Sequence, residues 1–319
     1  IVLSRLRGYT IFHLHWTYDF VPGRIARQWK VLNRLLYWRY IFILVVVRLI
    51  GFKLVWTAHN VLPHEPIFGG MDLKARMWLV RLANLVIVHS KSTISELSSL
   101  KLIPRAFAVI PHGSYLGVYQ NNILRTEARQ IRRLNENSFV YLFLGQIRDY
   151  KGIDRLLEAY SHVQTNETVL MIAGECCDPR LRQLLINKRN DKTIIWHDGK
   201  VSESDLQKFF NAADIAVLPF KRVTTSGSAL LALSFGKAII IPALGDMANI
   251  PSAVAYKYDP AQKNGLEQAM ISAMSDRNEN EKRGVSARKY AESLSWTKIA
   301  DATIRAFKDL FRVGDRTVR

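Results

Sequence analysis

The sequence predicts an α/β protein built from two Rossmann-like domains, each a doubly wound parallel sheet. The first observation is that short apolar runs, rich in Val, Ile and aromatic residues, recur in both halves of the chain. The second is that helical patterns lie between these runs, and such strand–helix alternation is typical of doubly wound parallel sheets. The length of 319 residues agrees with two domains.

The first half alternates regularly between the two kinds of element. Strands are expected at the short apolar runs Ile11–His15, Leu54–Ala58, Leu85–His89 and Ala108–Pro111. Helices are expected over the segments between them, at Ile25–Ile50, Leu73–Ala83 and Ser92–Leu100. We therefore place a first domain at residues 1–118. The polar, charged stretch at residues 119–138 is interpreted as the linker between the domains.

The second half repeats this organisation at residues 139–295. Its expected strands are Phe139–Leu144, Val169–Ala173, Ile194–Trp196, Ile215–Pro219, Ala238–Pro242 and Val254–Tyr258. Its expected helices are Ile153–His162, Pro179–Asn187, Glu203–Ala213 and Ser228–Phe235. A last helix is expected near Trp296–Phe311, within residues 296–319.

The composition excludes several classes of protein. Hydrophobic residues make up 49% and charged residues 23%, which excludes a disordered, collagen-like or disulfide-stapled chain. Lys and Arg number 45 against 27 Asp and Glu, so the formal net charge is +18. Such a chain is expected to bind anions, whether nucleic acid, an anionic membrane surface or a phosphorylated substrate. Its two cysteines, Cys176 and Cys177, are adjacent, which favours a reducing cytosolic compartment.

No membrane-spanning helix is expected. The longest apolar stretch, Tyr40–Val47, lies between Arg39 and Arg48 and is far shorter than the ~20 residues that a bilayer requires.

A histidine follows or ends each of four strands in the first half. These residues are His15, His59, His89 and His112. Because ligands bind beyond the carboxyl ends of strands in open α/β sheets, the four imidazoles are candidates to line one ligand site. The alternative is that they stabilise loops by hydrogen bonding. His13 and His15 share a strand face without a third ligand at a suitable spacing, so no metal site is expected.

Two segments of the second half are suited to phosphate. After the strand ending at Leu144, Gly145 opens a turn, and Arg148 and Lys151 lie beside the start of the next helix. A basic pair at a helix N-terminus suits a diphosphate, and the alternative is a solvated basic loop.

The second such segment precedes an apolar helix. It comprises Thr225, Ser226, Gly227 and Ser228. Its hydroxyls, its glycine and the backbone N–H groups make it a candidate anion cradle, and the alternative is an ordinary helix cap.

At this point the sequence resembles a known family. The run Gly145-Gln146-Ile147-Arg148, with Lys151-Gly152, resembles the donor-binding signature of family 4 glycosyltransferases (glycosyl transferases group 1), which have the GT-B fold. Further family segments are matched in order by Thr57–Asn60, Ile110–Gly113, Ile172–Gly174, Asn211–Asp214, Leu218–Pro219, Ser234–Ala238 and Leu294–Trp296.

The resemblance implies two Rossmann-like domains that face each other across a cleft. The second domain would hold a nucleotide-diphospho-sugar donor as co-substrate, and the first a saccharide or lipid-linked acceptor. The helix at 296–319 would cross back onto the first domain. Arg148 and Lys151 would neutralise the donor diphosphate, and no metal or other cofactor is expected. His59 matches the cleft-facing histidine of the family, which implies a hydrogen bond to donor sugar or acceptor and a role in proton transfer.

The chain departs from the family in two places. The family opens with a strand and a Gly-rich loop, and nothing before Ile11 supplies them, so we expect an N-terminally truncated and catalytically incomplete chain. The family also carries two glutamates eight positions apart near the donor, where this sequence has Val223 and Leu231.

The segment Arg24–Lys53 mixes basic and aromatic residues. Amphipathic basic segments of this kind bind anionic bilayer surfaces, so we expect a peripheral protein on the cytoplasmic face of the membrane. The alternatives are nucleic acid and a partly buried helix with a solvated basic face. After His59, a Pro-rich loop carries His64 and Glu65, which are acceptor-side candidates together with His15 and His112.

The preferred function is that of a glycosyltransferase in cell-surface polysaccharide or glycolipid synthesis. An alternative is a nucleotide-sugar 2-epimerase of the same fold, which needs acid and base carboxylates around the donor sugar. The non-enzyme alternative is a basic nucleic-acid-binding protein. It would explain the net charge but not the ordered strand–turn–helix motifs, so nucleic acid is not an expected partner.

Overall fold

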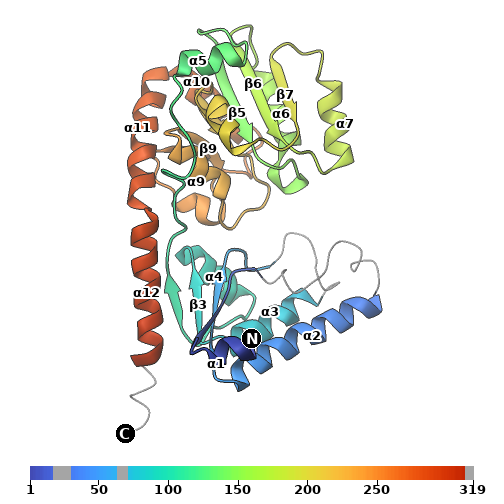
Figure 1. Cartoon of the computed structure of the whole chain (residues 1–319). Coiled ribbons are helices and arrows are strands. Elements are labelled where there is room, and N and C mark those ends of the chain that lie inside the picture. Colours follow the sequence, from blue (N-terminus) through green and yellow to red (C-terminus); the bar gives the residue numbers. More distant parts are fainter. Residues whose placement is uncertain (17–29, 63–70, 313–319) are drawn as a thin grey trace. The chain divides into compact units, whose positions relative to one another are not determined.

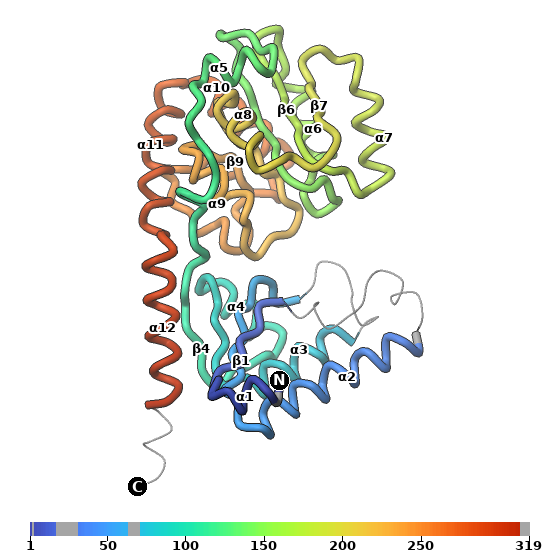
Figure 2. Tube along the Cα trace, in the orientation of Figure 1, coloured from blue at the N-terminus to red at the C-terminus, as the bar shows by residue number. Residues whose placement is uncertain are grey.

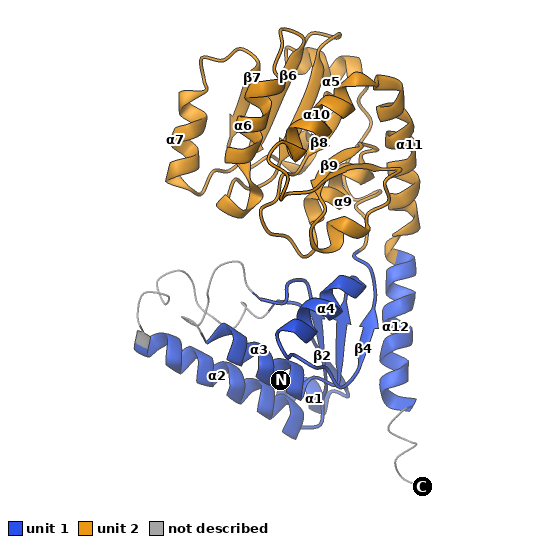
Figure 3. Cartoon of the chain, turned by 180° about the vertical axis from the view of Figure 1, so that it is seen from behind, with its two compact units in different colours: residues 1–112, 297–319 blue, residues 113–296 orange. Residues whose placement is uncertain are grey.

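The computed structural model describes residues 1–16, 30–62 and 71–312. The chain divides into two compact units, coloured separately in Figure 3. Unit 1 comprises Ile1–His112 with Thr297–Arg319, and unit 2 comprises Gly113–Trp296. The polar stretch 119–138, interpreted above as a linker, thus lies inside unit 2.

Unit 1 is a parallel α/β sheet (Figure 1). Its strands are β1 (Ile11–Leu14), β2 (Lys53–Ala58), β3 (Leu85–Val88) and β4 (Phe107–Val109), paired side by side in that order. Its helices are α1 (Val2–Leu6), α2 (Lys30–Leu49), α3 (Asp72–Leu82) and α4 (Lys91–Ser99), with α12 (Trp296–Arg312) added from the end of the chain. The part of the expected helix that precedes Lys30 falls outside the described residues.

The two faces of β2 bury different partners because successive side chains alternate. Leu54 and Trp56 pack with the helices α2 and α3, which lie side by side on one face (Figures 1 and 2). Val55 packs on the other face against α12, whose Ile299 and Phe307 join this smaller cluster. The last helix therefore completes the core of unit 1.

Unit 2 is a six-stranded parallel sheet with helices on both faces (Figure 1). Its strands are β5 (Phe139–Leu144), β6 (Thr168–Gly174), β7 (Ile194–Asp198), β8 (Ile215–Val217), β9 (Ile239–Pro242) and β10 (Ala255–Tyr258). Its α-helices are α5 (Arg125–Ile131), α6 (Ile153–Val163), α7 (Pro179–Asn187), α8 (Leu206–Phe210), α9 (Gly227–Ser234), α10 (Gly265–Ser275) and α11 (Arg277–Ser293).

The strand order of unit 2, β10-β9-β8-β5-β6-β7, reverses direction between β8 and β5. Ligands of doubly wound sheets bind at such a switch point, beyond the carboxyl ends of the strands. Tyr141 and Phe143 of β5 pack toward α6 and α10, and Val140 and Leu142 pack toward α8 and α9. Both faces of β5 are buried, so its carboxyl end is held firmly at the switch point.

The polar segment 119–138 contains helix α5. Its Ala128 is fully buried in the core of unit 2, and so is the side chain of Arg129. The Arg129 guanidinium donates to the carbonyls of Ala212 and Ser138 and forms a 2.9 Å ion pair with Asp214. The charge that makes this segment look like a solvated linker is instead satisfied inside unit 2.

The expected helix Glu203–Ala213 is shorter than predicted. It consists of a 3₁₀ turn at Glu203–Asp205, capped by Ser202, followed by α8, which ends at Phe210. None of the described helices is long and apolar enough to cross a bilayer.

Candidate functional site

The loops after β5 and β6 touch through two glycines. Gly145 has φ +149° and Gly174 has φ +148°, a backbone region that side chains rarely adopt. A Cβ on Gly174 would lie 2.0 Å from the carbonyl oxygen of Gly145. Beyond them, the amide of Ile147 donates to the Glu175 carbonyl at 2.9 Å. This close backbone packing fixes the loop that carries Arg148 and Lys151.

Lys151 is directed toward the start of α9. It ends a 3₁₀ turn, Asp149–Lys151, and Gly152 then enters α6 with φ +74°. A Cβ on Gly152 would lie 2.0 Å from the Pro219 carbonyl oxygen, so the turn packs tightly on the segment after β8. The Lys151 Nζ donates to the Ser228 Oγ at 3.4 Å and lies 4.7 Å from the centre of the Phe220 ring.

The charge on Lys151 is only partly stabilised by its surroundings. Burial, and then the positive charge of Arg148, lowers the pKa of the Lys151 ammonium to about 8. Within the described part of the chain, Lys151 forms no ion pair with a carboxylate. A lysine held in this way favours a bound anion, because an anion removes the electrostatic penalty.

Neighbouring cations have carboxylate partners instead. Lys221 forms ion pairs of 2.8 Å with Asp149 and 2.7 Å with Asp154, and Arg180 pairs with Asp149 at 2.7 Å. This network of ion pairs was not predicted from the sequence. Its only local signal was two aspartates on either side of Lys151, and the pairing with Lys221 depends on the fold.

Helix α9 supplies the other half of the candidate anion site. Ser226 is buried and caps the helix, since its side chain accepts a hydrogen bond from the Ala229 amide. Gly227 and Ser228 form the first turn, and the Ser228 Oγ lies 3.3 Å from the position of a Cβ on Gly145. The structure therefore brings Gly145, Lys151 and Ser228 together at the switch point. The N-terminus of α9 adds a partial positive charge.

Capping by Ser226 is compatible with an anion site formed by its neighbours. Thr225 is half-buried in the turn before the helix, and the adjacent Thr224 carbonyl accepts from the Asp246 amide at 3.0 Å. Val223 and Leu231, at the positions of the two family glutamates, both pack against the core of unit 2. These two positions contribute apolar packing here, not charge.

Gly227→Val is expected to weaken nucleoside diphosphate binding while leaving the fold largely intact. A Cβ on Gly227 would meet the Tyr115 hydroxyl at 3.0 Å, and the larger valine would cover the first-turn N–H groups. Calorimetric titration measures the affinity, and thermal melting reports the fold. If the folded variant binds with wild-type affinity, the phosphate lies elsewhere.

Binding of a nucleoside diphosphate is expected to take up protons at about pH 8.5, because the anion raises the depressed pKa of Lys151. Affinity should therefore fall as the pH rises above about 8. Calorimetry in buffers with different ionisation enthalpies measures this uptake. Lys151→Arg is the matched control, because a guanidinium stays protonated throughout this range. If this variant takes up as many protons on binding as the wild-type protein, the titrating group is not Lys151.

Unit 1 gathers its histidines at the carboxyl end of its sheet. The His15 Nδ1 lies 3.1 Å from the His59 Nε2, and the His59 Nδ1 lies 3.1 Å from the His89 Nε2. The His89 Nδ1 lies 2.9 Å from the carbonyl oxygen of Ile110. The ring of His112 lies beside this row, 5.4 Å from that of His89. His64 and Glu65 lie outside the described residues.

Burial lowers the pKa of three of these histidines, His13, His15 and His59, and so favours their neutral forms. Burial first, and then the neighbouring histidines, lowers the pKa of His59 to about 3. Burial lowers the pKa of His13 to about 4, and its Nε2 lies 2.8 Å from the Thr57 hydroxyl. Trp16 stacks on the His59 ring with 4.5 Å between centroids and 14° between planes. Both nitrogens of His59 are thus used within the cluster.

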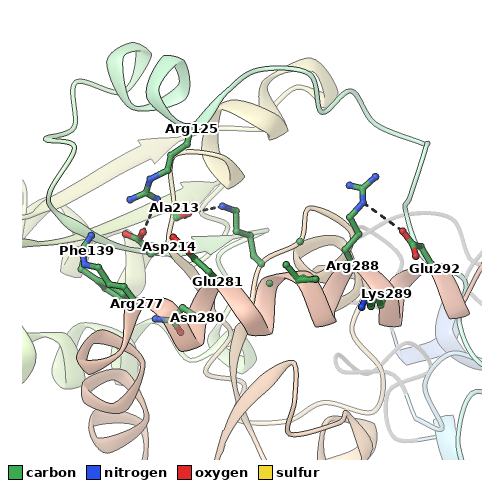
Figure 4. Close-up of a pocket in the computed structure, with 14 residues that line it drawn as sticks. Arg125, Phe139, Ala213, Asp214, Arg277, Asn280, Glu281, Arg288, Lys289 and Glu292 are labelled. Atoms are coloured by element: carbon green, nitrogen blue, oxygen red, sulfur yellow. Dashed lines mark hydrogen bonds and ion pairs between the residues drawn. The ribbon is translucent and has the colours of Figure 1, made fainter.

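A separate pocket of about 600 Å³ lies at the amino ends of the central strands β5 and β8 of unit 2, beside helix α11 (Figure 4). Its lining includes Phe139, which opens β5, and Asp214, which precedes β8. Asp214 pairs with Arg125 at 2.7 Å, and the Lys237 Nζ donates to the Ala213 carbonyl at 2.9 Å. These polar groups connect α5, and the segment that follows α9, to the residues just before β8.

The comparison that decides the family covers just over half of the chain. Residues 125–290 match the sequence profile described as Glycosyl transferases group 1. The chain belongs to this family. Unit 2, which holds the Gly145 loop and helix α9, contains the whole of the matched region.

Relatives extend the similarity to the remainder of this glycosyltransferase. A GDP-mannose:glycolipid 4-beta-D-mannosyltransferase of Xanthomonas campestris is 26% identical over 323 residues, covering 97% of this chain and 83% of the relative. Sucrose-phosphate synthase from Thermosynechococcus elongatus is similar in structure, with a TM-score of 0.76 at 19% identity, over 98% of this chain and 76% of that one. Anabaena HepE in complex with UDP also has a TM-score of 0.76, at 14% identity over 97% and 81%. The fold is GT-B.

Proposed function

We propose that this glycosyltransferase moves a sugar from a nucleotide-diphospho-sugar donor to a glycolipid acceptor. The observation that carries the proposal is the meeting of Gly145, Lys151 and Ser228 at the switch point of unit 2. Negative charge develops on the departing nucleoside diphosphate as its bond to the sugar breaks. Arg148, Lys151 and the N-terminus of α9 are suited to stabilise that charge. In this proposal these groups neutralise the diphosphate without a metal ion.

The relatives suggest the class of donor and acceptor. The Xanthomonas campestris relative is a GDP-mannose:glycolipid mannosyltransferase that spans nearly the whole chain, and Anabaena HepE binds UDP. We therefore propose a nucleoside diphosphate carrying a hexose as donor, with GDP-mannose as the first donor to test. Titration with GDP, UDP and a single-stranded oligonucleotide at one salt concentration tests whether the protein binds nucleoside diphosphates or nucleic acid. Tight oligonucleotide binding without nucleotide binding would contradict it.

A lipid-linked acceptor requires contact with a membrane, and unit 1 has a surface suited to one. Helix α2 exposes a row of large apolar side chains, including Trp38 at 62% and Phe42 at 68% exposure. The helix contains Arg34, Arg39 and Arg48 but no Asp or Glu. Exposed aromatic residues beside cations and no acids are typical of helices that lie in an anionic bilayer interface.

Helix α3 extends this surface. A pocket of about 610 Å³ lies between α2, α3 and residues 101–105, and it exposes Met77, Trp78 and Ile103. The cations that line it are Lys74, Arg81, Lys101 and Arg105. We propose that the α2–α3 surface binds anionic lipid on the cytoplasmic face of the membrane. Free Cys176 and Cys177 fit a reducing compartment.

Binding to anionic liposomes is expected to fall steeply as salt rises, with about 1 kcal/mol contributed by each cation near the surface. Arg34→Gln with Arg39→Gln should weaken this binding by roughly tenfold or more. The control removes two equally charged, exposed residues of unit 2, as Lys192→Gln with Lys263→Gln. Co-sedimentation measures the bound fraction. Equal binding to neutral and anionic vesicles would contradict an electrostatic contact, and no binding to either would exclude the membrane.

A further inference from the structure

The hydrogen bonds among His15, His59 and His89 determine where each proton lies. A carbonyl oxygen can only accept, so the His89 Nδ1, which is 2.9 Å from the Ile110 carbonyl oxygen, must carry a proton. A neutral imidazole has one protonated nitrogen, so the His89 Nε2 is an acceptor. The 3.1 Å contact with this atom then requires a proton on the His59 Nδ1.

The same reasoning extends one ring further. With its proton on Nδ1, His59 accepts at Nε2, so the 3.1 Å contact from His15 requires a proton on the His15 Nδ1. All three rings therefore adopt the Nδ1–H form. The remaining basic nitrogen is the Nε2 of His15, on an exposed residue. Among the residues that the structure describes, no hydrogen-bonding group occupies this atom.

We infer that His15 Nε2 is the general base that takes the proton from the acceptor hydroxyl, and that His59 and His89 are positioning residues behind it. This inference rests on the proposed transferase function. It changes the role expected for His59, since both ring nitrogens of His59 form hydrogen bonds inside the row. His15 is the exposed, terminal ring of the row, and it takes the role in proton transfer that was expected of His59.

The proposed step balances in atoms and charge. The acceptor oxygen forms a bond to the anomeric carbon of the donor sugar, and the bond from that carbon to the diphosphate oxygen breaks. The nucleoside diphosphate leaves with the electron pair of the broken bond. The hydroxyl proton moves to the His15 Nε2. Transfer of the Nδ1 protons along the row then places the positive charge on His89, where the Ile110 carbonyl oxygen stabilises it.

The alternative use of clustered histidines is a metal centre. In the described part of the chain, no three His, Cys, Asp or Glu side chains are arranged to hold a metal ion. The lone pairs that a metal would need on His59 and His89 accept hydrogen bonds from neighbouring rings. The row of imidazoles is therefore suited to pass protons along its hydrogen bonds.

The direct test determines which nitrogen of each imidazole carries the proton, and it needs no substrate. Long-range ¹H–¹⁵N spectra of the imidazoles, assigned with single His→Gln variants, distinguish Nδ1–H from Nε2–H rings. The inference expects Nδ1–H at His15, His59 and His89. It further expects that His89→Phe shifts His59 away from the pure Nδ1–H form, because the acceptor of that proton is lost. An Nε2–H signal from any of the three rings in the wild-type protein would overturn the inference.

The second test distinguishes the proposed general base, His15, from the positioning residues behind it. His15→Asn keeps an N–H donor near the Nδ1 position but has no base at Nε2. It should lower kcat by roughly a hundredfold, with the donor KM nearly unchanged. His162→Gln, an exposed histidine of unit 2, is the control. A wild-type kcat in His15→Asn would overturn the inference. Absence of transfer by the wild-type protein would instead overturn the proposed function on which it rests.

Discussion

Replacing Arg148 and Lys151 together by alanine is expected to weaken nucleoside diphosphate binding by about a hundredfold. Each charge-assisted hydrogen bond to a phosphate contributes about 1.5–3 kcal/mol, and two such contacts are lost. Lys151 forms no ion pair within the described residues, so its removal leaves no buried carboxylate without a partner. The loss should therefore appear in the affinity, not in the stability.

The control for this pair is an equal loss of charge elsewhere in unit 2. Lys192→Ala with Lys263→Ala removes two exposed cations, and a small change in affinity is expected because exposed charges are screened by salt. Isothermal titration with GDP and UDP compares the two double variants. If both double variants lose affinity equally, the loss is caused by the lower net charge of the protein. If neither loses affinity, Arg148 and Lys151 do not hold the diphosphate.

Gly174→Ala is expected to lower the stability of the fold strongly and to weaken nucleotide binding as well. The new Cβ would lie 2.0 Å from the Gly145 carbonyl oxygen, so the loops after β5 and β6 would have to separate. Steric overlap and an unfavourable φ together should lower the free energy of unfolding by about 3–5 kcal/mol. Displacement of the Gly145 loop should also move Lys151 away from Ser228 and weaken nucleotide binding.

Gly199→Ala is the matched control. Gly199 also has a positive φ, +137°, but a Cβ there would meet no atom within 4 Å. Only the backbone strain remains in this variant, and it should lower the free energy of unfolding by about 1–2 kcal/mol. Urea unfolding of the two variants compares the free energies of unfolding. Equal losses would mean that the contact with the Gly145 carbonyl adds nothing.

The features that the sequence predicted well are encoded locally. Strand β5 is a continuous apolar run that ends at a glycine turn, and its bounds match the prediction. The histidines of unit 1 were placed together because parallel strands end at one edge of a sheet, a rule that needs no knowledge of side-chain packing. The resemblance to group 1 glycosyltransferases, confirmed by the family match, rested on short motifs in a fixed order.

The features that the sequence did not predict depend on contacts between distant residues. The hydrogen bond from Lys151 to Ser228 joins positions 77 residues apart. Arg129 gives its segment a polar composition, although its side chain is buried against Ala212 and Asp214. Grouping the histidines did not reveal their hydrogen-bond order, because that order depends on the carbonyl oxygen of Ile110.

Sugar transfer by the protein is the activity that the proposed donor site must support. Mass spectrometry would follow UDP-, GDP- and ADP-sugars incubated with the protein and a glycolipid acceptor in anionic vesicles. We expect one donor to be consumed, its nucleoside diphosphate to be released and the acceptor mass to rise by one sugar residue. The Arg148→Ala, Lys151→Ala variant should abolish all three changes. Failure of the wild-type protein to bind or consume any nucleotide-sugar would contradict the assignment of the Gly145–Lys151–Ser228 site.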